Sequence, residues 1–395
     1  LFRSPGDSWG DTDKFDWAMM SVFGRVVYSW KDRYTFTGSL RGDGSSRFGK
    51  DNRWGIFPSV ALGWNLSNEE FWTNHIGENF GAKLRVSWGI SGNNNIGNYE
   101  HVGYMSNLGG YVLGGQIVPT RYPSAFVDNL LGWEKTDQYN VGMDLSFLRN
   151  RLTLSANYYN SISNDLLFNK PISAIAGATQ YKSNLSNAKI RNTGFDIQVD
   201  GRILTGPVTW NVGANLSLNR NKVLSLPDSQ SIVSIGERSA ISHITMVGKP
   251  IGSFYGLNSL GVISEEEYQR ILVDKQHIGE EGYQLTGPAV WNYENVQPGD
   301  AKWKDVNNDG KITDDDREIL GDNYPDFTYG FSTNISYKGV SLSASFSGVQ
   351  GAQVISFQNY YLLNMEGTCN QFALAADRYN SVTNPDPAMY RANIA

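Results

Sequence analysis

Two segments within residues 34–64 alternate strictly between two sets of side chains, and one set is largely apolar or small. The sequence of these residues is YTFTGSLRGDGSSRFGKDNRWGIFPSVALGW. A period of two predicts β-strands, because successive side chains of a strand point to opposite faces. One face of this pair carries Tyr34, Phe36, Gly38, Leu40 and Gly42, then Trp54, Ile56, Pro58, Val60, Leu62 and Trp64. Aromatic residues lie at the ends of this face, and the opposite face includes charges. An apolar outer band, aromatic rims and a polar interior are typical of a transmembrane β-barrel wall.

The aromatic residues at the strand ends predict two girdles, one at each membrane interface. We expect one rim to contain Trp30, Tyr34 and Trp64, and the other Trp54, Trp88 and Trp133.

The same alternation recurs along the chain and predicts about ten wall strands. The short connections between them are 31–33, 148–150, 204–207 and 338–339, and the longer ones include 65–81, 91–131 and 164–188. Outer-membrane barrels have short periplasmic turns and long external loops. Counting strand directions from the short turns places residues 221–326 outside. We therefore expect Ile241–Tyr255 to be β-structure of an external domain and not barrel wall.

This reading divides the chain into three regions. Residues 1–220 are expected to be barrel strands with extracellular loops, 221–325 a large extracellular loop domain, and 326–395 a barrel hairpin and the following extracellular loop. Ten strands enclose little lumen, so wall strands are expected to be missing on both flanks. The chain also begins at Leu1, without a methionine or signal peptide, which indicates a processed product or a fragment.

Composition and spacing exclude several function classes. A formal net charge of -6 argues against a nucleic-acid partner. Cys369 is the single cysteine, so neither a disulfide framework nor a cysteine metal site is expected. The four histidines are too scattered for a zinc cluster. Neither a G-x-S-x-G elbow, a P-loop nor an H-E-x-x-H motif occurs, so we expect no hydrolytic activity.

Charges predicted to face the lumen could bind substrate, although such charges more often solvate a lumen or hold a plug. They are Arg25, Arg41, Lys83, Arg85, Glu134, Asp144, Asp196 and Asp200. Aromatic residues of the predicted external segments could stack on sugars or pack loops together, and packing is the simpler role for any one of them. They are Tyr99, Tyr104, Tyr111, Tyr122, Trp291 and Tyr293.

Residues 305–316, DVNNDGKITDDD, match the spacing of a calcium-binding loop. The candidate ligands are the side chains of Asp305, Asn307, Asp309 and Asp316 and the carbonyl of Lys311. Gly310 permits the sharp turn, and Ile312 is placed to attach the loop to a small core. Asp replaces the usual Glu and no long helix precedes the loop, so it is similar to the stand-alone loops of dockerins. The alternative is an acidic solvated turn without an ion. External calcium would fill even a weak site of ~10⁻⁴ to 10⁻³ M, so the ion is expected to be structural.

Six segments together resemble the SusC-like (RagA-like) TonB-dependent outer-membrane transporters. They are KDRYTFTGSLRGDGSSRFGKDNRWGIFPSVALGW, LRVSWGISGNNNIGNY, WEKTDQYNVGMD, RNTGFDIQV, VGKPIGSFYGL and PGDAKWKDVNNDGKITDDDREILGD. The resemblance covers most of the chain and implies a 22-stranded antiparallel barrel with an N-terminal plug in the bacterial outer membrane. It also implies a SusD-like lipoprotein lid, import of oligosaccharides or peptides, and energy from the TonB complex. Neither plug nor TonB-contacting segment is recognisable, which suggests a middle-to-C-terminal portion of the barrel.

Two other classes remain open at the level of the sequence. A small outer-membrane barrel enzyme of the protease or lipase type would need a converging acid, base and nucleophile. A calcium-binding surface adhesion module would need a soluble core, which the outward Trp54, Leu62 and Trp64 oppose.

Overall fold

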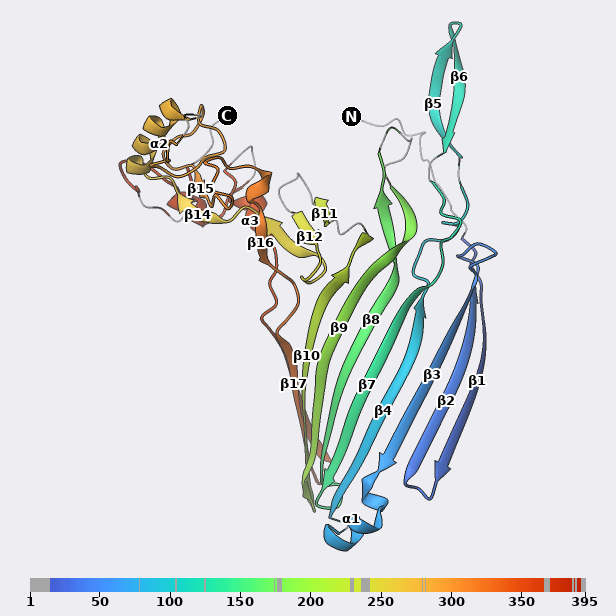
Figure 1. The fold of residues 1–395 in the computed structure, drawn as a ribbon. Helices are drawn as coiled ribbons and strands as arrows, with labels where there is room; N and C mark the ends of the chain where they lie inside the picture. The colour runs from blue at the N-terminus through green and yellow to red at the C-terminus, as the bar shows by residue number, and fades with distance from the viewer. Residues whose placement is uncertain are drawn as a thin grey trace. The chain divides into compact units, whose positions relative to one another are not determined.

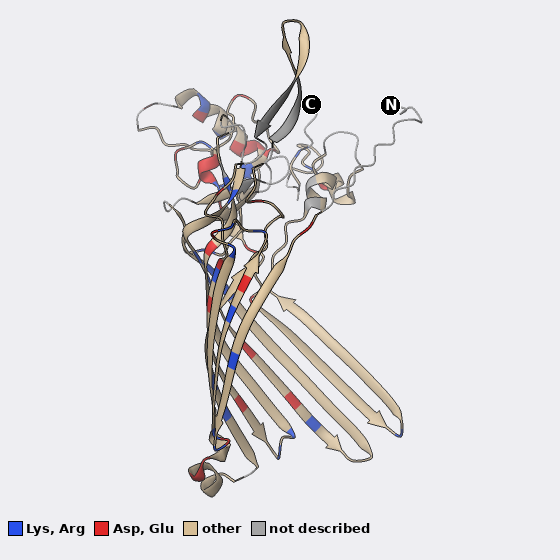
Figure 2. Ribbon diagram, turned by 90° about the vertical axis from the view of Figure 1, so that its right-hand side faces the viewer, with Lys and Arg blue, Asp and Glu red and all other residues tan. Residues whose placement is uncertain are grey.

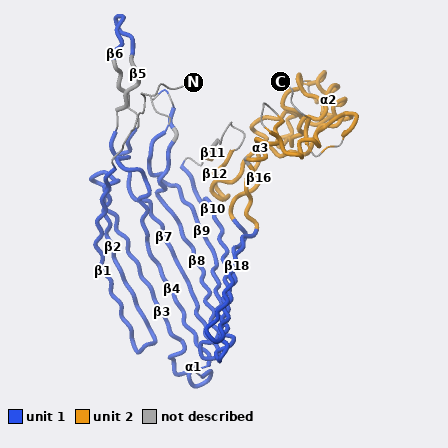
Figure 3. The backbone as a smooth tube through the Cα atoms, turned by 180° about the vertical axis from the view of Figure 1, so that it is seen from behind, with its two compact units in different colours: residues 1–230, 325–350 blue, residues 231–324, 351–395 orange. Residues whose placement is uncertain are grey.

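The computed structural model describes residues 15–77, 79–103, 105–123, 126–173, 175, 180–227, 231–235, 242–278, 280, 282–365, 370–385, 387 and 389–391. The chain forms two compact units (Figure 3). We call residues 1–230 with 325–350 the wall unit, and residues 231–324 with 351–395 the loop unit.

The wall unit is one ten-stranded sheet in which every neighbouring pair is antiparallel (Figure 1). Its strands, in order across the sheet, are β1 (Met19–Trp30), β2 (Tyr34–Ser45), β3 (Trp54–Asn65), β4 (Phe80–Asn93), β7 (Glu134–Phe147), β8 (Leu152–Pro171), β9 (Gln180–Thr205), β10 (Val208–Ser225), β17 (Phe327–Tyr337) and β18 (Val340–Gln350). The all-β antiparallel wall expected from the alternation is confirmed.

Strand register brings the first predicted girdle together. Trp30 lies opposite Tyr34, and Tyr34 lies opposite Trp64. Their rings stack, with centroids 5.7 Å apart for Trp30 and Tyr34 and 6.2 Å apart for Tyr34 and Trp64. Trp54 lies at the other end of β3, as expected.

The second predicted girdle is only partly correct. Trp88 lies opposite Val60, six residues along β3 from Trp54, and beside Tyr139 of the next strand with ring centroids 6.5 Å apart, so the register does not bring it to Trp54. Trp133, however, is 7% exposed and packs edge to face against Phe57, whose side chain belongs to the opposite, inward face of β3. Its placement at a lipid-facing rim is therefore wrong. A small local core of Phe48, Phe57, Ile96, Leu131 and Trp133 contains this indole.

Tight turns join the strands at one end of the sheet, at 31–33, 148–151, 206–207 and 338–339. The long connection 66–79 lies at this same end, because the strand count from β3 to β4 places it there (Figure 1). It contains a 3-10 turn, η1 (Leu66–Asn68), and a short helix, α1 (Glu70–His75). The expectation that every long connection lies outside is therefore wrong for these residues.

Two other predicted loops contain strands. Residues 105–123 form a hairpin of β5 (Met105–Leu113) and β6 (Gln116–Pro123) inside the expected loop 91–131. The expected loop 164–188 is mostly an extension of β8 and β9, which pair as far as Pro171 and Gln180. A register shift between Asn164 and Leu166 interrupts the alternation there, which is why the pattern ended too early.

The loop unit contains two small sheets. The first has four strands, β11 (Ile232–Ile235), β12 (Ser242–Thr245), β13 (Ser253–Gly256) and β16 (Glu318–Gly321). The second pairs β14 (Ser259–Val262) with β15 (Ala301–Trp303). β12 and β13 confirm that the segment ending at Tyr255 is β-structure outside the wall sheet, with Ile241 outside the described residues.

The helical parts of the loop unit are α2 (Glu265–His277), α3 (Phe357–Leu362), η5 (Asp314–Asp316) and η6 (Ala373–Asp377). α2 begins with a capping box, in which Ser264 and Glu267 bond to each other's backbone N–H. Ile271 of α2 is fully buried with Ile263 and Val290.

Residues after the last hairpin fold with the loop unit and not as a separate external loop. Arg391 pairs with Asp300, and its backbone N–H donates to the carbonyl of Gly299 at 2.7 Å. The boundaries of the two compact units therefore differ from the predicted regions 221–325 and 326–395. Residues 351–395 belong to the same unit as residues 231–324.

Among the described residues, no helix is both long and apolar enough to cross a membrane.

Candidate functional site

The inward face of β4, β7 and β8 carries a fixed polar cluster. Arg85 donates to both carboxylate oxygens of Asp144, at 2.7 and 2.8 Å, and its Nη2 also donates to Asn157 Oδ1 at 2.9 Å. Ser155 adds a 2.8 Å hydrogen bond to Asp144. A Cβ on Gly142 would lie 2.9 Å from Arg85 Nη2, so glycine makes room for the guanidinium. A bidentate Arg–carboxylate pair of this kind holds its geometry firmly.

The other predicted lumen charges are spread over several strands (Figure 2). Arg41 pairs with Asp43 at 2.7 Å, Gln198 donates to Asp200 at 2.8 Å, and Ser217 donates to Asp196. Glu134 accepts from Asn93 and from the backbone N–H of Leu167. Arg25 and Lys83 lie on β1 and β4. The structure thus does not bring these charges together in one site. They are distributed over the polar inward face of the sheet.

Glu69, which the sequence pattern did not single out, ties the connection 66–79 to the first girdle. Its Oε1 accepts from the hydroxyl of Tyr34 at 2.7 Å and from the indole N–H of Trp64 at 3.0 Å. Its Oε2 accepts from Arg33 Nη1 at 3.1 Å. The hydrogen bonds from Tyr34 and Trp64, followed by the charge of Arg33, hold the pKa of Glu69 below its usual value. The contacts with Arg33 and Tyr34 join residues about 35 positions apart, so no local sequence motif predicts them.

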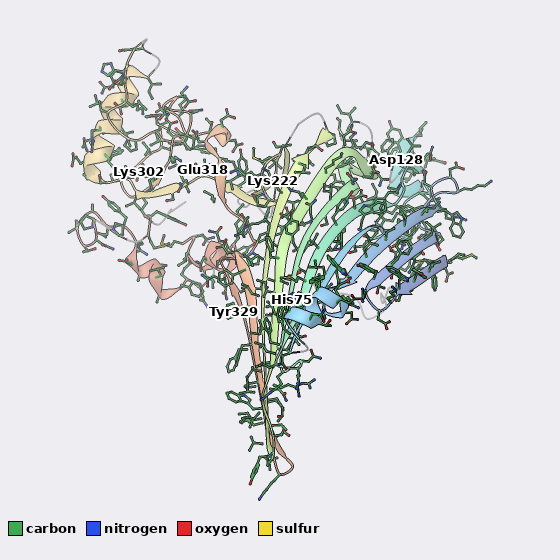
Figure 4. All side chains as sticks on the ribbon, turned by 60° about the horizontal axis from the view of Figure 1, so that its bottom comes forward. His75, Asp128, Lys222, Lys302, Glu318 and Tyr329 are labelled. Atoms are coloured by element: carbon green, nitrogen blue, oxygen red, sulfur yellow. The ribbon has the colours of Figure 1, made fainter. Side chains whose placement is uncertain are left out.

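A cavity of about 500 Å³ opens at the loop end of the wall unit. Aromatic rings, carboxylates, amides and amines line it together, including Trp54, Trp133, Asp51, Asp128, Asn52, Asn184 and Lys135. Asp128 stands among these residues near the loop end of the sheet (Figure 4). Such a mixture can hold a polar ligand against an aromatic surface.

Asn184 of β9 fixes one wall of this cavity. Its Oδ1 accepts from the N–H of Gly132 at 2.7 Å, and its Nδ2 donates to the carbonyls of Gly132 at 3.0 Å and Asp165 at 2.8 Å. The substitution Asn184→Ala should therefore release the segment before β7. Losing these bonds is expected to speed hydrogen exchange at the Gly132 amide by roughly tenfold or more. Asn169→Ala, an exposed change on the same hairpin, should leave that exchange rate unaltered; equal rates in both variants would contradict this role.

The predicted calcium loop is folded by its own side chains. Asp305 accepts from the N–H groups of Asn308 at 2.7 Å and Gly310 at 2.9 Å. Asn307 accepts from Asp309 N–H at 2.9 Å, and Asp309 accepts from Lys311 N–H at 2.8 Å. Gly310 has a φ of +83°, as the sharp turn requires. Each of these side-chain oxygens keeps a free lone pair.

Asp316, the last predicted ligand, is fully buried. Its two oxygens accept from the backbone N–H groups of Val306 at 2.9 Å and Thr313 at 2.7 Å. Burial disfavours its charge, but the hydrogen bonds from Thr313, Val306 and Asn307 outweigh burial and lower its pKa. Within the described ranges, no three His, Cys, Asp or Glu side chains converge on one point. The donors present are all oxygens, which is the chemistry that calcium prefers.

A small core holds this loop in place. Ile312 is 2% exposed, and its N–H donates to the carbonyl of Val290 at 3.2 Å. Tyr293 donates its hydroxyl to the carbonyl of Gly310 at 2.8 Å. Burial, with the nearby carboxylates of Asp274 and Asp305, raises the pKa of Tyr293 to about 12. The expected attachment of Ile312 to a core is confirmed.

The other external aromatic side chains that the structure describes are those of Tyr99, Tyr111 and Trp291. Tyr99 donates its hydroxyl to the carbonyl of Asp16 at 2.9 Å, which is a packing role. Tyr111 and Trp291 are 62% and 58% exposed. Tyr104 and Cys369 lie outside the described residues, and so does the side chain of Tyr122.

The family model "TonB dependent receptor-like, beta-barrel" matches residues 2–344. The chain belongs to the TonB-dependent receptor β-barrel family. TonB-dependent receptor P3 of Formosa agariphila is 32% identical over 90% of this chain and 34% of its own length. TonB-dependent receptor SusC of Bacteroides thetaiotaomicron is 32% identical over 83% of this chain and 30% of its own length. The chain thus spans about a third of the length of these relatives.

A solved structure described as the RagAB peptide transporter has the same fold, with a TM-score of 0.75 over 96% of this chain and 38% of that one. Its sequence identity is 24%, so this likeness concerns the fold alone. Membership of the TonB-dependent receptor family places the wall in the outer membrane. The relatives are named TonB-dependent receptors, which favours this class over the barrel enzyme and the adhesion module.

Proposed function

We propose that this chain forms part of the wall of a TonB-dependent importer that carries oligosaccharides or peptides across the outer membrane. The observation that carries this proposal is the family match over residues 2–344 on a wall whose inward face is polar. A partner similar to the SusD lipoprotein would cover its external end, and the TonB complex would supply energy through a plug. The relative named SusC supports this assignment.

The geometry agrees with passage of a polar molecule. The bonded cluster around Arg85 and Asp144 offers a hydrated inner surface and a fixed contact for a plug. The cavity near Trp54 and Asp128 adds polar groups at the loop end of the wall unit. Aromatic rings beside carboxylates and amides suit sugars and peptides alike.

Uptake by cells tests this proposal. Bacteria expressing the full-length receptor should take up a labelled glycan or peptide from a panel, and uptake should stop when TonB is deleted. Pull-down of the intact receptor should also recover a lipoprotein partner. Growth and uptake that do not depend on either TonB or the receptor would contradict the proposal.

Calcium binding by the loop 305–316 remains our proposal for the loop unit. Asp305, Asn307, Asp309 and Asp316 would hold the ion through side-chain oxygens, and Lys311 through its carbonyl. Three of the proposed ligands are carboxylates within one short loop and repel one another without a cation, so the ion should tighten the loop and its contacts with a lid protein.

Asp309→Ala should weaken calcium binding measured by calorimetry from the expected ~10⁻⁴ to 10⁻³ M range to an undetectable level. We also expect weaker lid docking and uptake, with the barrel still inserted, because the wall strands do not depend on the ion. Asp315→Ala is the matched control, since Asp315 is exposed and stands at no ligand position of the motif. Calcium binding that survives the double change Asp305→Ala and Asp309→Ala would contradict the site.

A further inference from the structure

Four cations stand together at the loop end of β9 and β10, and we call them the basic patch: Lys189, Arg191, Arg220 and Lys222. Arg191 lies directly opposite Lys222, and Arg220 lies opposite Thr193. Figure 4 places Lys222 near the loop end of its strand.

The basic patch faces lipid and not the lumen. The ladder between the two strands is regular from the apolar pair Phe195 and Leu218 to the pair Ile190 and Val223. Because side chains alternate, Arg191 and Lys222 share the face of Phe195 and Leu218. The intervening Ile190 and Val223 are 8% and 0% exposed and belong to the opposite, covered face. Lys189, Arg220 and Lys222 are exposed, and Arg191 is half-buried.

The height of the patch matches the boundary of a membrane. The outward residues of β10 are apolar from Val208 to Leu218: Val208, Trp210, Val212, Ala214, Leu216 and Leu218. Ten residue steps at ~3.3 Å, tilted by ~40°, span roughly 25 Å along the membrane normal, the usual height of the apolar band. The aromatic rings of Tyr158 and Phe195, with centroids 5.0 Å apart, lie at the loop end of this apolar band. The basic patch follows at once, at the level of lipid headgroups.

The positive charge of the patch is poorly compensated. Arg220 pairs with Asp326 at 3.3 Å. In the part of the chain that the structure describes, Lys189, Arg191 and Lys222 make no side-chain hydrogen bond or ion pair with another residue. A second carboxylate on this face, Asp137 of β7, accepts from Asn164 Nδ2 at 3.2 Å. Like charges directly opposite on a sheet, such as Arg191 and Lys222, repel each other, and a bound anion would remove that cost.

We propose that the basic patch binds the phosphate groups of an outer-leaflet glycolipid. The site lies on the lipid-facing side directly above the apolar band, so acyl chains would pack on Phe195 and Leu218 while phosphates meet Arg191 and Lys222. Guanidinium and ammonium groups together suit phosphate oxygens. A soluble anion would interact with the charged side chains but not with the apolar band. We therefore propose a lipid as the ligand. This proposal rests on the barrel assignment and is independent of the transported substrate.

Titration of lipid A into the full-length receptor in a neutral detergent tests the site. The double change Arg191→Gln with Lys222→Gln should weaken binding roughly 30-fold, since each cation near an anionic surface contributes about fivefold. Lys50→Gln with Lys182→Gln removes the same charge from external positions away from the patch and should change binding less than about twofold. Dephosphorylated lipid A should bind the unaltered receptor as weakly as intact lipid A binds the Gln double variant.

Other outcomes would overturn the proposal. Equal binding of phosphorylated and dephosphorylated lipid A, or full binding by the Gln double variant, contradicts a phosphate site. Inorganic phosphate that competes with lipid A at equal phosphate concentration contradicts the lipid source. If the double variant does not fold, Lys222→Gln alone changes one exposed side chain and should still weaken binding roughly fivefold.

Discussion

Replacing Met143 with arginine should lower the free energy of unfolding of the full-length receptor in lipid vesicles by about 2–4 kcal/mol. Met143 faces outward on β7, opposite Leu84 of β4 and Ala156 of β8. It lies midway between the outward aromatic residues Tyr139 and Phe147, near the centre of the apolar band. A charge there would have to leave water or distort the bilayer, which is the costliest position for an arginine.

Asn140→Arg is the matched control on the same strand. Asn140 points to the opposite, inward face, where its Nδ2 donates to Ser87 Oγ at 3.4 Å. The inward face already accommodates Arg85, so this variant should lose less than about 1 kcal/mol. Denaturant titration of both proteins gives the comparison. Equal losses, or a larger loss for Asn140→Arg, would reverse the assignment of the two faces.

Asp274→Ala should destabilise the loop unit by about 3 kcal/mol, because it leaves buried donors without an acceptor. Asp274 is fully buried on α2. Its carboxylate accepts from the hydroxyl of Tyr283 at 2.8 Å and from the backbone N–H groups of Thr286 at 3.0 Å and Gly287 at 2.7 Å. Hydrogen exchange at the Thr286 and Gly287 amides measures the loss locally in the intact receptor.

Glu266→Gln on the same helix provides the control for that change. Glu266 is 86% exposed and pairs with Arg270 at 3.4 Å. An exposed pair of this kind contributes less than about 0.5 kcal/mol. If hydrogen-exchange protection of the Thr286 and Gly287 amides is unchanged in Asp274→Ala, the carboxylate does not organise residues 283–287.

Acid should loosen the loop unit. Burial disfavours the charge of Asp274, but hydrogen bonds from Thr286, Gly287 and Tyr283 outweigh burial and lower its pKa, and the pKa of Asp316 is lowered in the same way. A lowered folded-state pKa means stability that is fully present above the ordinary value of 3.8 and is lost as the pH falls through the folded-state value. Amide protection around residues 283–287 should therefore fall below about pH 4 and remain constant from pH 5 to 8. Loss of amide protection already at pH 6 would contradict the assignment of this pH dependence to the Asp274 carboxylate.

The alternation of side chains was sufficient to predict the wall strands, because lipid and lumen make opposite demands on the two faces of each strand. Where the alternation predicts the wrong structure, the cause is local. At Asn164 a register shift breaks the period of two, so the alternation predicts a loop where β8 in fact continues. At Trp133 the residue type suggested a rim, but packing against Phe48 and Phe57 decides its position.

The functional sites were less predictable, because they depend on contacts between distant residues. Glu69 meets Tyr34 only after β2 and β3 have paired, and Asn184 meets Gly132 across 52 positions. The basic patch combines cations from two strands that are 29 to 33 positions apart, such as Arg191 with Arg220, and only the register of β9 with β10 brings them together. The calcium loop is contiguous, which is why its residues could be named from spacing alone.

Site-directed spin labelling along β7 tests the assignment of the wall most directly. Single cysteines at each position from Tyr139 to Phe147, in full-length receptor carrying Cys369→Ser, would be labelled within outer membranes. Collision with lipid-soluble oxygen should peak at 139, 141, 143, 145 and 147, and collision with a water-soluble relaxing agent should peak at the positions between them. Accessibility without a period of two, or with the two sets exchanged, would contradict a barrel wall with this face toward lipid.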